Sequence, residues 1–285
     1  MGSNPKPEYF RNCSNLLSSF FFTFVFMINS NPIGLFDSGI GGTSIWKEIH
    51  QLMPNENTIY LADSKNAPYG QKTKDEIIAL SIKNTEYLLN QNAKIIVVAC
   101  NTATTNAIKE LRAKYDVPFI GIEPAIKPAA NNSRTQTIGI LATKGTLNSE
   151  LFNKTAEQFQ DTNIIEQVGY NLVKLIEDGE MHSDEMTSLL KTYLTPMIEA
   201  NIDYLVLGCS HYPYLIPQIK EILPHHIKII DSGEAVARQT YKVLEEKIGL
   251  NTVAGEHSTL FYTNSDPKVL KSILENKYPV IQKDF

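Results

Sequence analysis

Several features that are common in metal-binding, disulfide-bonded and nucleic-acid-binding proteins are missing from this chain of 285 residues. It has only three cysteines, too few for a disulfide scaffold, and neither a CxxC nor an HExxH motif. Its lysines and arginines form no cluster, and the net charge of −5 gives no electrostatic reason to expect a nucleic-acid partner. Cys209 and His211 could share a metal, but two ligands two residues apart are weak support. We expect no metal site and a reducing compartment, which favours the cytoplasm.

No membrane span is expected either. The apolar stretch from Leu16 to Ile28 is shorter than the roughly 20 residues that a span needs. Lys6 and Arg11 precede this stretch, which resembles a short signal peptide, but no small-x-small cleavage site follows. Met27 stands just before the first expected strand and would make a natural start. We favour an upstream extension or misassigned start for residues 1–26, over a signal or anchor and over an added helix or strand.

Two of the three cysteines stand in closely similar contexts, whereas Cys13 lies in the N-terminal segment and is given no role. Cys100 closes the apolar run Ile95–Ala99, and Cys209 closes the run Tyr204–Gly208. Each run is typical of a buried parallel strand, and the residues after it indicate a turn into a helix. Two thiols at such turns could face one small ligand from opposite sides. That arrangement would allow a proton to leave one face of a carbon while another arrives at the opposite face.

Other strand-like segments recur in the same order, which indicates an internal duplication. Ile33–Phe36 precedes the first cysteine and Ile138–Leu141 precedes the second, at an offset of 105 residues, while the cysteines are offset by 109. Pro118–Glu123 follows the first cysteine as Ile227–Asp231 follows the second. Three segments in register favour a duplication, and the alternation of strands and helices from Pro32 onward predicts parallel sheets covered by helices.

The expected fold is therefore α/β, with two pseudo-symmetric three-layer α/β lobes whose sheets are rich in parallel strands. The first lobe would comprise residues 27–123 together with 232–285, and the second would comprise residues 124–231. Ligands of such sheets bind beyond the carboxyl ends of the strands. An active site in the cleft between the lobes is expected, because polar or thiol side chains stand at four of these ends, namely Asp37, Cys100, Thr143 and Cys209.

Helix boundaries can be predicted at several places. Thr73–Glu76 has the spacing of a capping box and predicts a helix through about Asn90. Further helices are expected after each cysteine, over Thr102–Tyr115 and from Pro213, since proline suits a first helical turn. The polar segment Asn131–Thr137 is expected to be a loop.

Several motifs resemble those of glutamate racemases, which belong to the wider aspartate/glutamate racemase family. CNTA alone would fit the wider group, whereas DSGxGG, NAPYG and CxHYP together point to the glutamate branch. The resemblance runs from about Ile33 to Arg238. The motifs are DSGIGG at 37–42, NAPYG at 66–70, CNTAT at 100–104, ATKGT at 142–146, GCSHYP at 208–213 and DSGEAVA at 231–237.

This resemblance implies a cofactor-independent enzyme that interconverts L- and D-glutamate and supplies D-glutamate for peptidoglycan synthesis. One cysteine thiolate would take the α-proton and the opposite thiol would return a proton to the other face. Cys100 would act on D-glutamate and Cys209 on L-glutamate. Because both stand at expected helix N-termini, the helix dipole and free N–H groups would favour the thiolates. The resemblance also implies a cytoplasmic enzyme that can form homodimers.

Polar neighbours are expected to support the thiols and to hold the substrate. Asp37 would be the partner of Cys100, or would simply cap the helix that begins near Gly42. His211 would assist Cys209, or would be an ordinary residue at a helix start. Substrate-binding groups are expected at Asp37, Ser38, Tyr69, Gly70, Asn101, Thr102, Thr143, Ser210 and His211.

Two departures from the family pattern bear on this site. Ser210 stands where the family usually has threonine, which keeps the hydroxyl and removes a methyl group. Gly169–Glu177 stands where the family often has a CPxFVPLVE-like segment, but it lacks the cysteine and both prolines. Glu177 would therefore either assist near the second thiol or be a surface helix residue. Ser38 and Tyr69 have an alternative too, as residues that serve only their own turns.

Three other functions compete with that of a glutamate racemase. An aspartate or other amino-acid racemase would use the same two thiols, but its usual motifs lack DSGxGG and HYP. A cysteine hydrolase would need one nucleophile and one base, which would leave the second cysteine idle. A non-catalytic amino-acid-binding protein would still bind its ligand after either cysteine is replaced by serine.

Overall fold

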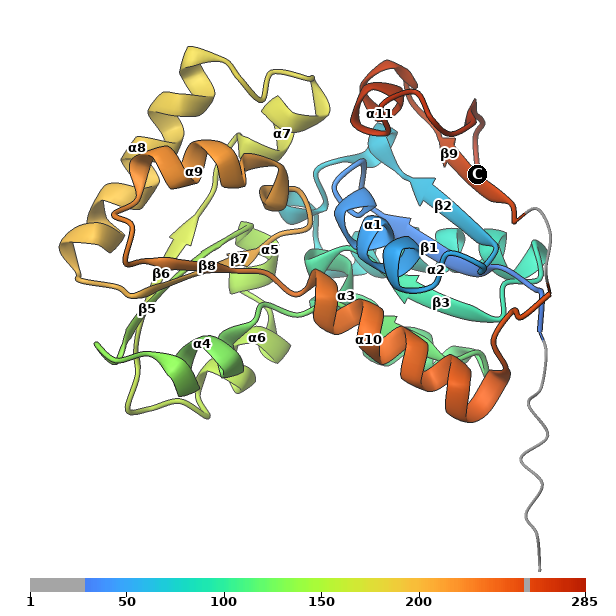
Figure 1. Cartoon of the computed structure of the whole chain (residues 1–285), viewed down its shortest axis with the longest axis horizontal. Coiled ribbons are helices and arrows are strands. Elements are labelled where there is room, and N and C mark those ends of the chain that lie inside the picture. Colours follow the sequence, from blue (N-terminus) through green and yellow to red (C-terminus); the bar gives the residue numbers. More distant parts are fainter. Residues whose placement is uncertain (1–28, 254–256) are drawn as a thin grey trace, which may run out of the picture.

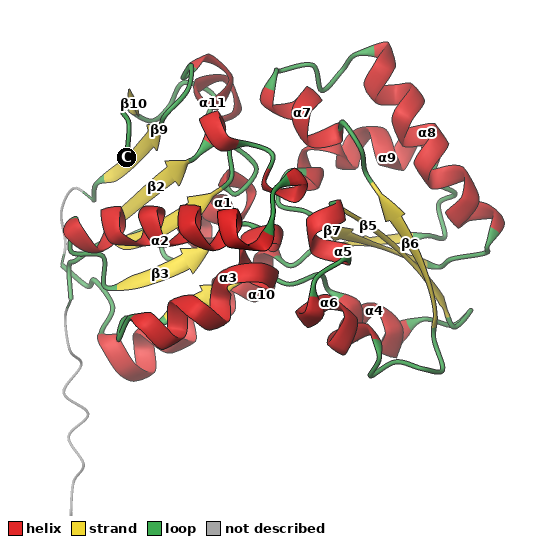
Figure 2. Ribbon diagram, turned by 180° about the vertical axis from the view of Figure 1, so that it is seen from behind, coloured by secondary structure: helices red, strands yellow, loops and turns green. Residues whose placement is uncertain are grey.

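A computed structural model describes residues 29–253 and 257–285, so the segment 1–26 discussed above lies outside the described residues. The chain forms two lobes side by side, each built on a parallel sheet with helices on both faces (Figures 1 and 2). The predicted α/β class and the two-lobe arrangement are confirmed. No helix in the described ranges is long and apolar enough to cross a membrane.

Lobe 1 contains a six-stranded sheet in the order β10-β9-β2-β1-β3-β4. Helices α1 and α10 cover one face, and α2 and α3 cover the other (Figures 1 and 2). The strands are β1 (Ile33–Asp37), β2 (Thr58–Ala62), β3 (Ile95–Val98), β4 (Phe119–Gly121), β9 (Thr259–Thr263) and β10 (Val280–Gln282). The helices are α1 (Thr43–Leu52), α2 (Lys74–Asn90), α3 (Asn101–Lys114), α10 (Gly233–Val243) and α11 (Lys268–Ile273), with short 3-10 turns at Ser64–Asn66 and Tyr69–Gln71 and a π-helical turn at Leu244–Ile248.

Lobe 2 contains a four-stranded sheet in the order β6-β5-β7-β8. Helices α8 and α9 lie on one face, and α4 and α6 lie on the other (Figure 1). The strands are β5 (Thr137–Ala142), β6 (Asn163–Val168), β7 (Tyr204–Gly208) and β8 (Lys228–Ile230). The helices are α4 (Ile126–Asn132), α5 (Lys144–Leu147), α6 (Glu150–Ala156), α7 (Leu172–Glu177), α8 (Asp184–Glu199) and α9 (Ile216–Ile222), the last preceded by a 3-10 turn at Tyr212–Leu215.

The two sheets repeat one another. The order β2-β1-β3-β4 in lobe 1 corresponds to β6-β5-β7-β8 in lobe 2, and every one of these pairs is parallel. Strands β9 and β10 extend only the sheet of lobe 1. The chain leaves lobe 1 after β4 and returns to it with α10, which packs on α1. We propose lobe boundaries at residues 123/124 and 231/232, within these two crossings.

Side-chain caps account for the starts of several helices, among them α2, α3 and α8. Thr73 and Glu76 form the predicted capping box, with the Thr73 N–H donating to Glu76 Oε2 at 2.8 Å and the Glu76 N–H to Thr73 Oγ1 at 3.3 Å. Helix α4 runs further into the predicted loop 131–137 than expected, because the Asn132 side chain donates to the Pro128 carbonyl at 2.7 Å and holds the last turn. After Cys209 the chain first forms a 3-10 turn and becomes α-helical only at Ile216.

A buried ion pair stabilises the lobe 1 sheet at the end opposite the cysteines. Lys94, just before β3, places its Nζ 2.7 Å from Glu56 Oε2, and both side chains are almost completely buried. Lys94 also donates to the carbonyls of Asn29 and Gly249. Glu56 in turn accepts from the Asn251 N–H at 2.7 Å. The contacts of Lys94 and Glu56 thus connect the segments before β1 and β3 with the segment after α10.

Replacing Lys94 with methionine is expected to destabilise the protein strongly. The substitution leaves the Glu56 carboxylate buried without its counter-charge, and such a loss costs about 3–5 kcal/mol. Urea denaturation followed by circular dichroism measures the effect. Lys154→Met is the matched control, because Lys154 pairs with Glu150 on the exposed surface of α6 and its loss should leave the midpoint unchanged. Equal midpoints for the two variants would contradict this role of the buried pair.

Candidate active site

The two cysteines follow equivalent strands of the two lobes. Cys100 comes after β3 and caps α3, with its sulfur accepting from the Ala103 N–H at 3.4 Å. Cys209 comes after β7, and its carbonyl accepts from the Tyr212 N–H at 3.1 Å. Both are free thiols and both are buried. They lie close enough for the charge of Cys209 to contribute to the raised pKa of Cys100.

Both thiols line one small enclosed cavity between the lobes, which we call the reaction cavity. The space in which the centre of a water molecule can move is only about 10 Å³, roughly enough for a single water. An amino acid does not fit this closed conformation, so the walls must separate to admit one. The walls are Ser38, Pro68, Tyr69, Gly70, Cys100, Asn101, Thr102, Thr143, Val173, Cys209, Ser210 and His211.

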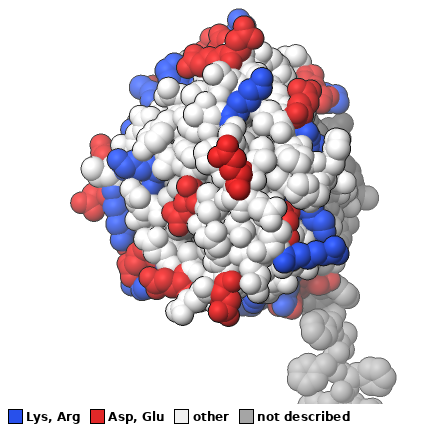
Figure 3. Space-filling model, turned by 90° about the vertical axis from the view of Figure 1, so that its left-hand side faces the viewer, with Lys and Arg blue, Asp and Glu red and all other residues white. Residues whose placement is uncertain are grey.

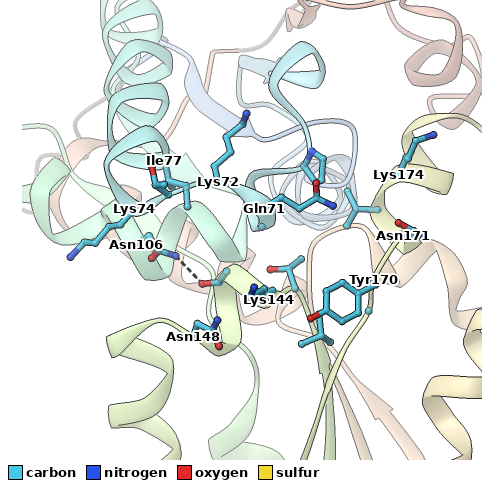
Figure 4. A pocket seen from close by; sticks show the side chains of 18 residues that line it. Gln71, Lys72, Lys74, Ile77, Asn106, Lys144, Asn148, Tyr170, Asn171 and Lys174 are labelled. Atoms are coloured by element: carbon cyan, nitrogen blue, oxygen red, sulfur yellow. Dashed lines mark hydrogen bonds between the residues drawn. The ribbon is translucent and has the colours of Figure 1, made fainter.

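A larger cavity of about 490 Å³ opens outside the reaction cavity, and we call it the vestibule (Figure 4). Four residues line both spaces: Pro68, Gly70, Thr143 and Val173. The remaining walls of the vestibule are Gln71, Lys72, Thr73, Lys74, Ile77, Asn106, Lys144, Gly145, Asn148, Val168, Gly169, Tyr170, Asn171 and Lys174.

The boundary between the two spaces depends on a close approach of two backbones. A Cβ atom placed on Gly145 of α5 would lie 2.9 Å from Thr102 Cγ2 and 3.1 Å from the Gly70 Cα. The Asn106 side chain holds this region by donating to the Gly145 carbonyl at 3.0 Å (Figure 4). Glycine at both positions therefore lets the lobes close over the reaction cavity.

Gly145→Ala is expected to disturb this closure and to lower kcat. An added methyl group in a close-packed contact costs about 1–3 kcal/mol, and a penalty in the closed, reactive state corresponds to a loss of about 5- to 150-fold in kcat. Steady-state kinetics measures the loss, and small-angle X-ray scattering should show a larger radius of gyration. Wild-type kcat in this variant would show that closure at Gly145 is not required for turnover.

Asp37 lies beside Cys100 and also fulfils the capping role considered from the sequence. Its Oδ2 accepts from the N–H groups of Gly42 at 2.9 Å and Gly39 at 3.3 Å. Burial raises the pKa of Asp37, and the charge of His211 and hydrogen bonds from Gly42 and Cys100 oppose this rise. Both interpretations of Asp37 therefore describe contacts that it makes.

Opposing effects act on the pKa of the Cys100 thiol. Burial, together with the charge of Asp37, raises the pKa of this thiol well above its ordinary value. The N–H groups of Ala103 and Ser38 act in the opposite direction, as the helix N-terminus predicts, but they do not outweigh burial. The pKa of Cys100 is therefore raised in the closed conformation, which favours its thiol form.

Cys209 has a different neighbour, the imidazole of His211. His211 Nδ1 lies 3.8 Å from the Cys209 sulfur and 4.0 Å from Asp37 Oδ2, while Nε2 lies 2.6 Å from Glu177 Oε1. Burial disfavours a charged imidazole, but hydrogen bonds with Cys209 and Glu177 and the charge of Asp37 outweigh it and raise the pKa of His211 well above its usual value. A histidine whose pKa is raised therefore stands beside Cys209, whereas the carboxyl group of Asp37 stands beside Cys100. His211 Nε2 also lies 3.2 Å from the Gly41 nitrogen.

Glu177 belongs to the network of His211 and is not a surface residue. It is the last residue of α7, and its two carboxylate oxygens accept from the Ile40 N–H at 2.6 Å and from the Ser64 hydroxyl at 2.8 Å. A Cβ atom on Gly39 would lie only 1.9 Å from Glu177 Oε1. Glycine in the DSGIGG segment is thus required by the approach of this carboxylate from the other lobe.

The amide and hydroxyl groups of the reaction cavity include some that are free to bind a ligand. The side-chain nitrogen and oxygen of Asn101 are both buried and have no hydrogen-bond partner among the residues that the structure describes. Beside them, the hydroxyls of Thr102, Thr143 and Thr146 form a triangle with sides of 2.8, 3.0 and 3.3 Å. Thr146 was not singled out from the sequence. Thr146 stands three residues after the helix cap Thr143 and donates its N–H to the Thr143 hydroxyl. This spacing is the signal that could have identified Thr146.

Tyr69 differs from its predicted role. Its ring lines the reaction cavity, but its hydroxyl donates to the buried carboxylate of Asp63 and accepts from Asn84 at 3.1 Å. In this conformation the Tyr69 hydroxyl is therefore engaged by Asp63 and Asn84 within lobe 1. Nothing in the local sequence marked Asp63 or Asn84 for this pairing, because it depends on how α2 packs on the sheet.

Ser210 joins the two lobes at the back of the site. Its hydroxyl donates to Asp37 Oδ1 at 3.2 Å, and its carbonyl accepts from the Ser44 hydroxyl at 2.8 Å. The hydroxyls of Thr43 and Tyr214 lie 2.5 Å apart in the same region. The first turn of α1 is thereby fastened to the chain around the second cysteine. We call this set of contacts the rear junction.

Among residues 29–253 and 257–285, no group of three or more His, Cys, Asp or Glu side chains is arranged to hold a metal ion. The acids and the histidine around the thiols bind one another and backbone N–H groups instead. The site is thus built from two thiols with unequal polar neighbours.

The sequence profile of the Asp/Glu/Hydantoin racemase family matches residues 33–240. The chain belongs to this family. It is accordingly an amino-acid racemase, an isomerase, and its resemblance to glutamate racemases is confirmed by its relatives. The glutamate racemase of Ralstonia pickettii is 43% identical over 244 residues, covering 85% of this chain and 86% of that protein.

Solved structures of family members share the two-lobe fold. Escherichia coli glutamate racemase, solved with L-glutamate and the activator UDP-MurNAc-ala, matches with a TM-score of 0.80 and 31% identity over 89% of this chain and 98% of that one. Francisella tularensis glutamate racemase, solved with D-glutamate, matches with a TM-score of 0.77 and 28% identity over 90% and 98% of the two chains. An aspartate racemase from Picrophilus torridus, at 16% identity and a TM-score of 0.54, shows the shared fold alone.

Proposed function

We propose that this racemase interconverts L- and D-glutamate by a two-base mechanism in which Cys100 and Cys209 act from opposite sides of the substrate. The observation that carries the proposal is that thiols from the two lobes line one closed cavity together with the unpartnered carboxamide of Asn101. The names of the relatives support glutamate as the substrate.

The proton transfers balance as follows. With L-glutamate bound, the Cys209 thiolate takes the α-proton and becomes a thiol, and the C–H electron pair enters an enediolate-like form of the α-carboxylate. The Cys100 thiol then donates its proton to the opposite face of the α-carbon and is left as a thiolate, which yields D-glutamate. Starting from D-glutamate, the two cysteines exchange roles.

The unequal neighbours of the thiols suit these roles. The positive charge of His211 stabilises the negative charge on the Cys209 sulfur, and Glu177 keeps the imidazole protonated and oriented. Burial keeps Cys100 protonated, so that it is ready to deliver a proton. Asp37 lies beside Cys100, and the thiol helps to lower the pKa of this carboxyl.

The reaction also requires stabilisation of the enediolate-like intermediate. Fixed donors in a site without bulk water are effective for this, because they need no reorganisation as charge develops. The Asn101 carboxamide and the hydroxyls of Thr102 and Thr143 supply such donors in the closed cavity, with Ser38 and the backbone at Gly70 as further wall contacts. Ser210 also lines the cavity, but its hydroxyl already donates to Asp37. Closure over the substrate would exclude water from the carbanion.

The cellular role belongs to the same proposal. A glutamate racemase of this kind would supply D-glutamate for peptidoglycan synthesis from a cytoplasmic location, without a cofactor and as an enzyme able to form homodimers. The family resemblance of the motifs is what supports each of these statements.

Proton exchange in heavy water tests the substrate and the reaction together. The enzyme is incubated with L-glutamate or L-aspartate, deuterium at the α-carbon is followed by NMR, and inversion is followed by circular dichroism. We expect deuterium incorporation and inversion with glutamate. Exchange of aspartate alone would point to the other branch of the family, and binding without exchange would point to a non-catalytic protein.

A further inference from the structure

The vestibule differs in charge from the rest of the protein. The chain carries 31 acidic and 26 basic side chains, and at the lobe 2 end of the molecule the two signs are interspersed over the surface (Figure 3). The vestibule walls instead contain four lysines and no aspartate or glutamate: Lys72, Lys74, Lys144 and Lys174. Figure 4 shows that these lysines come from both lobes.

Two of these lysines are not engaged in ion pairs within the described part of the chain. Lys74 lies 3.6 Å from Glu110, and Lys174 pairs with Asp178. Lys72 and Lys144 have no such partner among the described residues. Lys144 also directly follows Thr143, which lines both the vestibule and the reaction cavity. Two lysines without an ion-pair partner among the described residues therefore stand where the vestibule meets the reaction cavity, and the exposed Glu76 of α2 is close enough to Lys72 for their charges to interact.

We propose that the vestibule is an outer anion site that captures the dicarboxylate substrate before the walls of the reaction cavity separate. This inference rests on the proposed function, since it takes glutamate, with a net charge of −1, as the ligand. The volume of about 490 Å³ is in the range of small-molecule sites and is ample for an amino acid. The reaction cavity itself, at about 10 Å³, has no room for one until it opens.

The physical reason is that a cleft lined by one sign of charge concentrates ligands of the opposite sign. Such clefts raise association rates by roughly 10- to 1,000-fold, and the effect falls as salt is added. A ligand of charge −1 near two free lysines should fall at the low end of this range. Capture outside the cavity should affect how often substrate enters, and should leave the proton transfers between Cys100 and Cys209 unchanged.

Substituting the free lysines tests the inference. In Lys72→Gln/Lys144→Gln, kcat/KM for glutamate at low ionic strength should fall about 3- to 10-fold, through KM, while kcat stays at the wild-type value. The inhibition constant of glutarate, a dianion of the same length, should rise more than KM does. Added salt should lower kcat/KM of the wild type and have a smaller effect on the variant.

The matched control removes the same charge elsewhere on each lobe. Lys220 on α9 and Lys242 on α10 are exposed and lie outside the vestibule walls, so Lys220→Gln/Lys242→Gln should keep wild-type kcat/KM. Equal losses in both double variants, or a fall in kcat without a change in KM, would overturn the outer anion site. Failure of the proposed function would be distinguished at once, because the wild type itself would not racemise glutamate.

Discussion

Cys100→Ser and Cys209→Ser should each lower kcat/KM for glutamate racemisation by at least about 10³-fold, in both directions. A positioned acid or base contributes about 10²- to 10⁴-fold, and a serine hydroxyl is far too weak an acid to replace a thiol in either role. L- and D-glutamate have the same free energy in solution, so the ratio of kcat/KM in the two directions must stay at one. Either substitution therefore slows both directions equally.

Hydrogen exchange then distinguishes the two cysteines. In heavy water, the Cys100→Ser enzyme keeps the Cys209 base and should exchange the α-proton of L-glutamate without inverting it. The Cys209→Ser enzyme should exchange D-glutamate instead. NMR of each enantiomer measures the exchange, and Cys13→Ser, which removes the remaining thiol, is the control that should keep full activity. Full racemisation by either active-site single variant would rule out the two-thiol mechanism.

His211→Asn is expected to have the second-largest effect, a loss of about 10²-fold or more in kcat/KM. The substitution removes the positive charge beside Cys209 and leaves Cys100 untouched, so proton transfer at Cys209 becomes the slow step in both directions. α-Deuterated L-glutamate should then show a large primary isotope effect. α-Deuterated D-glutamate should show a smaller one, because Cys100 removes its deuterium in a fast, reversible step. Equal isotope effects for the two enantiomers would contradict this assignment of His211.

The pH dependence should follow from the same network. A raised pKa keeps His211 positively charged at neutral pH, and the charge is lost as the pH rises through that value. In Glu177→Gln, one of the contacts that raise this pKa is removed, so the alkaline limb of the kcat/KM profile should move toward neutral pH. Asp178→Asn, which alters the neighbouring exposed carboxylate, should leave the profile in place. An unmoved profile in Glu177→Gln would mean that Glu177 does not set the charge of His211.

The sequence alone predicted the fold to a useful depth. Buried runs such as Ile95–Ala99 and a capping box at Thr73 are local signals, and the repeated order of strands placed Cys100 and Cys209 at equivalent strand ends. The pairing of Glu177 with His211 could be suggested only by the family motif, since α7 and the turn after β7 meet through tertiary packing. The role of Ser64 in holding Glu177 left no local signal at all.

The protonation of the thiols shows why the site was harder to predict than the fold. The helix N-terminus at Cys100 is visible in the sequence and favours a thiolate. Burial acts in the other direction and is the larger effect, but it depends on the closure of the two lobes around the cavity. The pairing of the Tyr69 hydroxyl with Asp63 likewise depends on tertiary packing, in this case of α2 on the lobe 1 sheet, and not on local sequence.

The rear junction has a consequence for how the enzyme passes from one turnover to the next. Ser44 and Ser210 join α1 to the chain beside Cys209, whereas on the vestibule side the lobes meet at Gly70 and Gly145 and through the hydroxyls of Thr102 and Thr143. Separation of the walls should therefore occur on the vestibule side, with the rear junction as the fixed edge. His211 would keep its contacts with Glu177 and Asp37 while substrate enters and product leaves. The polar groups around Cys209 would then keep their arrangement between turnovers and would not have to reassemble around each new substrate.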